Sequence, residues 1–283
     1  MECLMRFGPV VFAWRIDDAN PRWNPFLDAY AAHFARHSNA CATVAIEAAV
    51  GEFRPTSKLP PSLIRGRVVR GRDFDLGDGL VRGAVPCEGE VRCTIDPVLL
   101  NGNGLRLLEQ FFYLLFHEAA LVGTTSDATR PFLMHGSAVL SQERVHVFTG
   151  PSEAGKSTAA ANSRPRAILT DECVAIVPGL DGLCAMGTPV NPFCVERTLG
   201  EGPLKGVYLL EKTFTHTLLP VATAEAVTRL VPEVMVPLRL LETDLGVGMG
   251  RALDRALLLC RAGLVRRLQF KPDPGFWRLL ETN

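Results

Sequence analysis

The sequence predicts an α/β protein in two parts. Residues 1–128 form a smaller, β-rich α+β region, and residues 129–283 form an α/β domain with a mixed sheet. Short alternating strand patterns separated by Pro and Gly predict the first part. A glycine-rich loop, GPSEAGKST, lies between an apolar strand pattern and a helix start and predicts the second. Paired strand patterns follow this loop, rather than strictly alternating strands and helices, so we expect a mixed sheet.

Length and charge narrow the possible functions. The chain has 283 residues, enough for one large domain or two smaller ones with a sizeable core. It carries 30 Lys and Arg against 30 Asp and Glu, so its net charge is zero. A nucleic-acid partner is not expected, because such proteins usually show a basic excess or a basic stripe. The most basic stretch, residues 65–75, alternates with apolar residues and indicates a strand with a solvated face.

Location is predicted from three further features. No stretch reaches the roughly 18 consecutive apolar residues that a membrane-spanning helix needs. The short apolar run near the N-terminus is followed by Asp17 and Asp18 without a cleavage pattern, so we expect no signal peptide. The eight cysteines are scattered and form no CxxC pair, which is typical of a reducing compartment. We therefore expect a cytoplasmic protein without a membrane partner.

The first part is expected to begin with a strand and a helix, continue as hairpins and end with a helix. The strand covers residues 8–16, and an amphipathic helix covers 24–38. Short strands follow at 41–48, 65–74, 79–87 and 90–97, and a strongly apolar helix covers 104–123. A polar linker, residues 124–131, then contains the expected boundary between the two parts.

The second part is expected to contain strands and helices on both sides of the glycine-rich loop. Before the loop, strands are predicted at 132–140 and 144–150, and a helix begins directly after it. The remaining elements are strands at 166–170, 173–179, 206–212 and 264–270, helices at 223–231 and 250–263, and a short helix near Trp277.

The loop fits the Walker A pattern G-x-x-x-x-G-K-[ST]. In such a loop, backbone N–H groups converge on phosphate oxygens, and glycines allow the close approach of the backbone. Lys156 can reach the β- and γ-phosphates, and the Ser157 hydroxyl can ligate Mg²⁺. The predicted nucleotide-binding residues are Gly150, Pro151, Ser152, Glu153, Ala154, Gly155, Lys156, Ser157 and Thr158. Glu153 places an anion in a phosphate cradle; its side chain either points to solvent or alters phosphate affinity.

An acidic pair and a histidine are further candidates. Asp171 and Glu172 end an apolar strand, where ligands gather in open α/β sheets. Adjacent strand residues point to opposite faces, so one carboxylate can face a metal and the other an acceptor. The alternative is a pair of solvated turn carboxylates. His135 also ends an apolar strand, and taken alone that setting is more typical of a core histidine.

Three segments in this order resemble the catalytic domain of HPr kinase/phosphorylase, the bacterial serine kinase of the sugar phosphotransfer system. They are His135-Gly136, the 150–158 loop and DECVAI at 171–176. The resemblance covers roughly residues 132–283 and implies a P-loop fold of the HPr kinase and PEP carboxykinase type, which binds ATP and Mg²⁺. It implies that Glu172 deprotonates an acceptor serine and that His135 is an active-site residue.

The resemblance also implies which residues bind metal and phosphate. Ser157, Asp171 and Glu196 would hold Mg²⁺, Lys156 would act on the phosphates, and Arg239 corresponds to a weakly matching Pro-Val-Arg stretch. The second acid is Glu here where the family has Asp, and the N-terminal half does not resemble that of HPr kinase.

The layout is more similar to HPr-kinase-related proteins of bacterial biosynthetic clusters, some of which phosphorylate a serine of a precursor peptide. A peptide or small-protein acceptor is therefore the first hypothesis. The first part of the chain would then recognise the acceptor or form a homo-oligomer. An ATP-binding regulatory or assembly module without transfer is one alternative. A small-molecule kinase or another transfer enzyme of this fold is a second.

Overall fold

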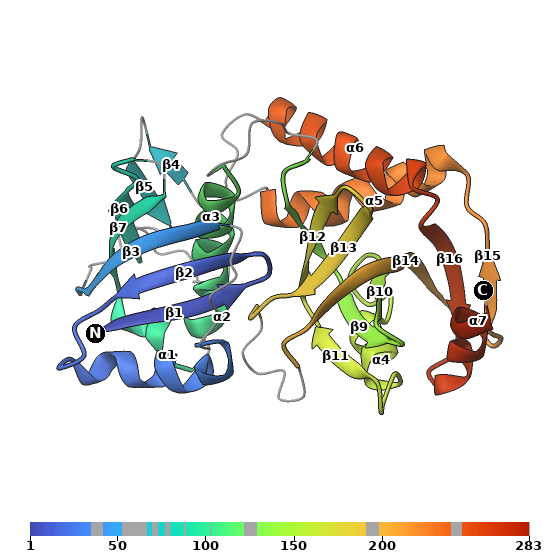
Figure 1. The fold of residues 1–283 in the computed structure, drawn as a ribbon, viewed down its shortest axis with the longest axis horizontal. Helices are drawn as coiled ribbons and strands as arrows, with labels where there is room; N and C mark the ends of the chain where they lie inside the picture. The colour runs from blue at the N-terminus through green and yellow to red at the C-terminus, as the bar shows by residue number, and fades with distance from the viewer. Residues whose placement is uncertain are drawn as a thin grey trace. The chain divides into compact units, whose positions relative to one another are not determined.

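A computed structural model describes residues 1–34, 42–52, 67–69, 73–76, 80–87, 89–102, 104–121, 129–190, 198–238 and 245–282. The chain forms two compact units; the first contains the chain up to Arg130, and the second contains most of residues 131–283 (Figure 1). Each unit contains a mixed sheet. Within the described ranges, no helix is both long and apolar enough to span a membrane.

The first unit contains a sheet in the order β1-β2-β3-β7-β6-β5-β4. Its strands are β1 (Glu2–Phe7), β2 (Val10–Arg15), β3 (Ala42–Val50), β4 (Arg67–Val69), β5 (Asp73–Leu76), β6 (Val81–Ala84) and β7 (Glu90–Ile95). The described strands pair antiparallel, as expected of hairpins, except that β3 lies parallel to both β2 and β7. A helical segment between β2 and β3 makes this connection a crossover rather than a hairpin, which permits the parallel pairing.

Aromatic side chains form the core of the first unit. The predicted apolar helix at 104–123 is present as α2 (Gly104–Leu107) and α3 (Glu109–Leu121), and α3 packs on β2 and β3. Phe112 of α3 is fully buried and lies against the rings of Phe7, Phe12 and Trp14. The shorter helical segments are α1 (Asn24–Ala29), η1 (Pro21–Trp23), η2 (Ala31–His33) and η4 (Pro97–Leu100).

The described part of the second unit contains nine strands. They run in the order β11-β9-β10-β14-β13-β12-β8, with β16 beside β14 and β15 beside β16. These strands are β8 (Phe132–His135), β9 (Ser137–Ser141), β10 (Arg144–Thr149), β11 (Ala167–Thr170), β12 (Cys173–Gly179), β13 (Gly182–Gly187), β14 (Glu201–Lys212), β15 (Thr217–Leu219) and β16 (Val265–Phe270). β10 and β16 lie parallel to β14, so these three strands end at the same edge of the sheet.

The predicted strand at 132–140 is in fact two strands. β8 pairs with β12, whereas β9 pairs with β10 and β11, and the chain changes partners at Gly136. A Cβ at this glycine would lie 2.9 Å from the carbonyl oxygen of Phe148, so the close approach requires glycine. The Gly136 N–H donates to the Glu172 carbonyl oxygen at 3.0 Å. This break therefore brings the end of β8 next to the acidic turn.

The helices of the second unit are α4 (Lys156–Ala161), α5 (Thr223–Leu238), α6 (Leu245–Arg261), η6 (Pro274–Phe276) and α7 (Trp277–Thr282). Helix α5 is longer than the predicted 223–231, because it continues through Pro232. An internal proline removes one helical hydrogen bond. The burial of Val234 and Met235 beyond it offsets this loss. α4 packs on β9 and β10, next to a core that contains Phe148 and Trp277.

Candidate active site

The 150–158 loop connects β10 to α4 and has the backbone that its glycines permit. Gly150 has φ 148° and Gly155 has φ 102°, both in the region that favours glycine. A Cβ on Gly155 would lie 2.9 Å from Cζ of Phe270, so a larger residue would clash with the core. The Lys156 ammonium donates to the carbonyl oxygens of Gly150 at 2.7 Å and Pro151 at 3.2 Å. The lysine is thus folded back across the loop.

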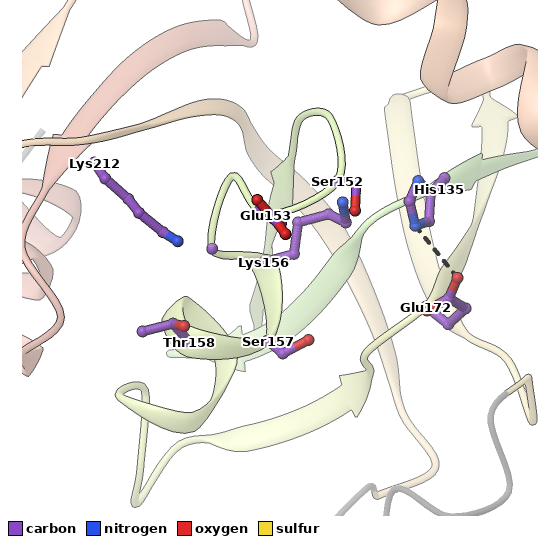
Figure 2. Close-up of a pocket in the computed structure, with 9 residues that line it drawn as sticks. His135, Ser152, Glu153, Lys156, Ser157, Thr158, Glu172 and Lys212 are labelled. Atoms are coloured by element: carbon purple, nitrogen blue, oxygen red, sulfur yellow. Dashed lines mark ion pairs between the residues drawn. The ribbon is translucent and has the colours of Figure 1, made fainter.

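Glu153 is the exception in this loop, because it has φ 67° without being a glycine. Non-glycine residues adopt the left-handed conformation at a cost in free energy. Its side chain is exposed and lines the cavity beside the loop, as Figure 2 shows. The side chain is thus exposed to solvent and also lies next to the phosphate cradle. Its effect on phosphate affinity stays a prediction.

A cavity of about 520 Å³ lies beside the loop within the second unit (Figure 2). Its lining comes from the end of β8, the loop, the start of α4, the turn after β11 and the end of β14. The lining residues are His135, Ser152, Glu153, Gly155, Lys156, Ser157, Thr158, Glu172 and Lys212. The volume is typical of small-molecule sites. Two lysines and two glutamates give it both the cations that bind phosphate and the acids that can move a proton.

Asp171 lies next to the loop serine. Its Oδ1 accepts a hydrogen bond from Ser137 Oγ at 2.8 Å, and its side chain is also hydrogen-bonded to Ser157. Burial raises the pKa of this carboxyl, and the two serine hydroxyls oppose the rise only in part. A hydroxyl and a carboxylate at one point form a hard oxygen set, which suits Mg²⁺.

The described residues provide only a small set of metal ligands. Among the described residues there is no group of three or more His, Cys, Asp or Glu that could hold a metal ion. Mg²⁺ in phosphate-transfer sites is usually held by one or two carboxylates together with phosphates and water, so a two-residue set fits this ion. Glu196 and Arg239 lie outside the described residues.

Glu172 contacts His135. Its Oε1 lies 3.3 Å from Nε2 of His135, and the other ring nitrogen, Nδ1, lies 2.8 Å from Oε2 of Glu233. Burial lowers the pKa of His135, but its hydrogen bonds to Glu172 and Glu233 outweigh burial and raise the pKa to about 9. His135 is therefore a cation at neutral pH. It lines a cavity rather than filling a core, so the interpretation as a core histidine is wrong.

The structure thus brings most of the predicted residues together, although Gly150, Pro151, Ala154 and Asp171 do not themselves line the cavity. Sequence reasoning missed Ser137, Lys212 and Glu233. Ser137 directly follows the His-Gly pair. Lys212 is the last residue of the predicted strand at 206–212, and its place at a strand end is a sequence signal that could have identified it.

Comparisons with known proteins give limited information. No family model matches the sequence, and no curated protein matches it. A solved structure with similarity is that of the Hpr(Ser) kinase/phosphatase from Coxiella burnetii, at 14% sequence identity and a TM-score of 0.27. The alignment covers 53% of this chain and 91% of that chain. At this TM-score the similarity supports no functional conclusion, so the function must be argued from the cavity itself.

Proposed function

We propose that this chain is an ATP- and Mg²⁺-dependent kinase that transfers the γ-phosphate to a hydroxyl, namely a serine of a peptide or small protein. The observation that carries this proposal is the meeting of three parts at one cavity. These parts are the Walker A loop, the Glu172–His135 pair, and Ser157, whose hydrogen bond to Asp171 adds a carboxylate next to the lining. Phosphoryl transfer needs a phosphate cradle, metal ligands and a group that orients or deprotonates the acceptor.

The loop and two lysines would bind the nucleotide. Backbone N–H groups of the loop and of the first turn of α4 suit phosphate oxygens. Lys156 bonds to loop carbonyl oxygens, and it would exchange them for the β- and γ-phosphates. Lys212 lies across the loop from His135 and adds a second cation (Figure 2). Ser157 and Asp171 would hold Mg²⁺, which neutralises phosphate charge when it is bound.

Glu172 would act on the acceptor. The acceptor hydroxyl gives its proton to the Glu172 carboxylate, and its oxygen forms a bond to the γ-phosphorus. The bond between this phosphorus and the bridging oxygen breaks, and ADP leaves with that electron pair. The His135 cation hydrogen-bonds Glu172 and holds the carboxylate at the cavity. The serine acceptor itself rests on the resemblance of the sequence motifs.

A second candidate function is an ATP-binding regulatory or assembly module without transfer. Glu153 favours it, because an anion on the cavity wall weakens phosphate binding and is held there in a strained conformation. In either case, residues 1–128 are the candidate region for acceptor recognition or homo-oligomer formation, and the cytoplasm remains the expected location.

The test is phosphate transfer from γ-labelled MgATP into a size-fractionated extract of the producing organism. Lys156→Ala should weaken MgATP binding about 10- to 150-fold, because a charge-assisted contact contributes about 1.5–3 kcal/mol. Glu172→Gln should abolish transfer and leave MgATP binding intact. Lys205→Ala serves as the control, since Lys205 is on β14 but does not line the cavity.

Each distribution of the label has a distinct meaning. Lys156-dependent label in a peptide or protein fraction supports the kinase proposal. Label in small molecules would show a small-molecule kinase instead. Tight MgATP binding with label only in inorganic phosphate, or with no label released, would favour the regulatory module. Transfer by Glu172→Gln at the wild-type rate would refute the role of Glu172.

A further inference from the structure

Glu233 is a buried carboxylate behind the cavity. Its side chain lies on α5, its residue is 5% exposed, and it does not line the cavity. On the helix it follows Leu230 by three residues and precedes Val234, and both of these are fully buried. Burying a carboxylate is unfavourable unless a cation or several donors compensate it. Glu233 therefore requires a cationic or hydrogen-bond-donating partner that compensates its charge on this otherwise apolar helix face.

His135 is that partner, and it connects Glu233 to the cavity. Nδ1 of the ring lies 2.8 Å from Glu233, and Nε2 lies 3.3 Å from Glu172. The backbone of His135 is held in place as well, because its carbonyl oxygen accepts a hydrogen bond from Thr149 Oγ1 at 2.8 Å. Ionised carboxylates only accept hydrogen bonds, so a ring that bonds to both must donate from both nitrogens. The imidazole bridges the buried acid and the cavity acid.

We propose that Glu233 is the positioning residue of this site, which holds the His135 ring so that Nε2 donates to Glu172 and keeps the Glu172 carboxylate in the cavity. This inference rests on the proposed kinase function and adds to it a residue that acts only through another side chain. It also assigns α5 a part in the site, although α5 contributes no side chain to the cavity lining.

A purely structural role for Glu233 is the competing explanation. Helix α5 already buries Ala226, Leu230, Val234 and Met235, so apolar contacts suffice to anchor it. A further apolar residue would anchor the helix without the cost of a buried charge. A carboxylate is needed where a donor must be oriented and kept charged. Lys156 opposes the charge on His135, whereas Glu172 and Glu233 favour it.

Loss of Glu233 should reduce the transfer rate without reducing nucleotide binding. Without Glu233, the ring can rotate and donate to other acceptors, and Glu172 loses its fixed position. A displacement of about 1 Å at a reacting group can reduce the rate about 100-fold. Glu233→Ala should therefore slow transfer about 10- to 100-fold. Glu233→Gln, which keeps one acceptor oxygen, should slow it less. The Kd for MgATP should stay within about two-fold for both, since Glu233 does not reach the cavity.

The experiment compares transfer and binding on the full chain. Wild type, Glu233→Gln, Glu233→Ala and Lys156→Ala are assayed with γ-labelled MgATP and the fractionated extract, and MgATP binding is measured in parallel. The matched control is Glu225→Gln, because Glu225 lies on the same helix and pairs with Arg267 away from the cavity lining. Loss of α5 stability would affect both glutamate variants, whereas loss of ring position would affect only the Glu233 variants.

A second readout needs no acceptor. Ring nitrogen NMR signals of His135, assigned by their absence in His135→Asn, report protonation and hydrogen bonding between pH 6 and 10. The wild-type ring should be doubly protonated at neutral pH and lose a proton with a midpoint near pH 9. In Glu233→Gln its pKa should fall, and the neutral ring should show a mixture of tautomers. Glu225→Gln should match the wild type.

The outcomes separate the inference from the proposed function. Slower transfer with unchanged MgATP binding and an altered His135 signal supports the inference. Wild-type transfer by Glu233→Ala, an equal loss in Glu225→Gln, or an unaltered His135 signal would overturn it while Lys156-dependent transfer persists. If the wild type and Lys156→Ala transfer equally little, the proposed function fails, and the inference is rejected with it.

Discussion

Replacing Glu153 with glycine should strengthen MgATP binding. The residue combines two unfavourable features: its φ of 67° suits glycine, and its exposed carboxylate lines the cavity where phosphates are expected. Glycine removes the strain and the charge together, so the two effects must be separated by further variants.

The magnitudes depend on the conformation and exposure of Glu153. The left-handed conformation costs a non-glycine residue about 1–2 kcal/mol, and glycine removes this cost. The greater freedom of glycine in the unfolded chain offsets about 0.5–1 kcal/mol of the resulting stabilisation. The free energy of unfolding should thus rise by about 0.5–1 kcal/mol. An exposed carboxylate about 6 Å from one phosphate charge repels it by about 0.7 kcal/mol in a water-like dielectric. The Kd for MgATP should therefore fall about three- to ten-fold, for one or two phosphate charges.

Two controls assign these effects. Glu153→Gln keeps the strained backbone and removes the charge, so it should strengthen MgATP binding without raising stability. Glu143 has φ 61° in the turn between β9 and β10 and does not line the cavity. Glu143→Gly should therefore match the stability gain of Glu153→Gly without changing MgATP binding. Isothermal titration calorimetry and urea unfolding measure the two quantities.

Three results would refute this reasoning. Unchanged MgATP affinity in both Glu153 variants would show that the carboxylate does not face bound phosphate. Weaker binding in Glu153→Gln would show instead that the carboxylate contributes a favourable contact to the complex. A stability gain in Glu143→Gly without one in Glu153→Gly would show that the loop backbone relaxes at no cost.

Three predictions concern the stability of the second unit. Gly136→Ala should lower the free energy of unfolding by about 1–3 kcal/mol, because its Cβ would lie 2.9 Å from the Phe148 carbonyl oxygen. Gly250→Ala, where α6 offers open space, should raise it by about 0.5–1 kcal/mol; an equal loss in both would contradict this account. His146 is buried, and burial chiefly lowers its pKa to about 4, below the value near 6.5 in an unfolded chain. The unfolded state therefore binds more protons between these values, and His146 should reduce stability by about 2 kcal/mol at pH 5 relative to pH 7. Urea unfolding of His146→Gln should lack this part of the pH dependence, and an identical pH profile would exclude His146 as its source.

Short-range patterns in the sequence were enough to identify the elements that form the loop. The strand before Gly150, the loop and the start of α4 are indicated by residues within a few positions of one another, and all three are present. The apolar helix at 104–123 was predictable for the same reason. Lys156, Ser157, Asp171 and Glu172 were recognised by residue type and by their position after strands, although their chemical roles stay predictions.

Local patterns failed where distant segments decide the structure. A single strand was predicted at 132–140, because nothing near Gly136 indicates that β8 and β9 pair with different strands. Glu233 was missed because its helix was predicted to end at Val231, whereas α5 continues through Pro232 to Leu238. The bond between His135 and Glu233 joins residues 98 positions apart. Composition and periodicity specify which segments are strands or helices, but contacts at such separations depend on the packing of whole elements, so only the folded chain determines which side chains meet at the cavity.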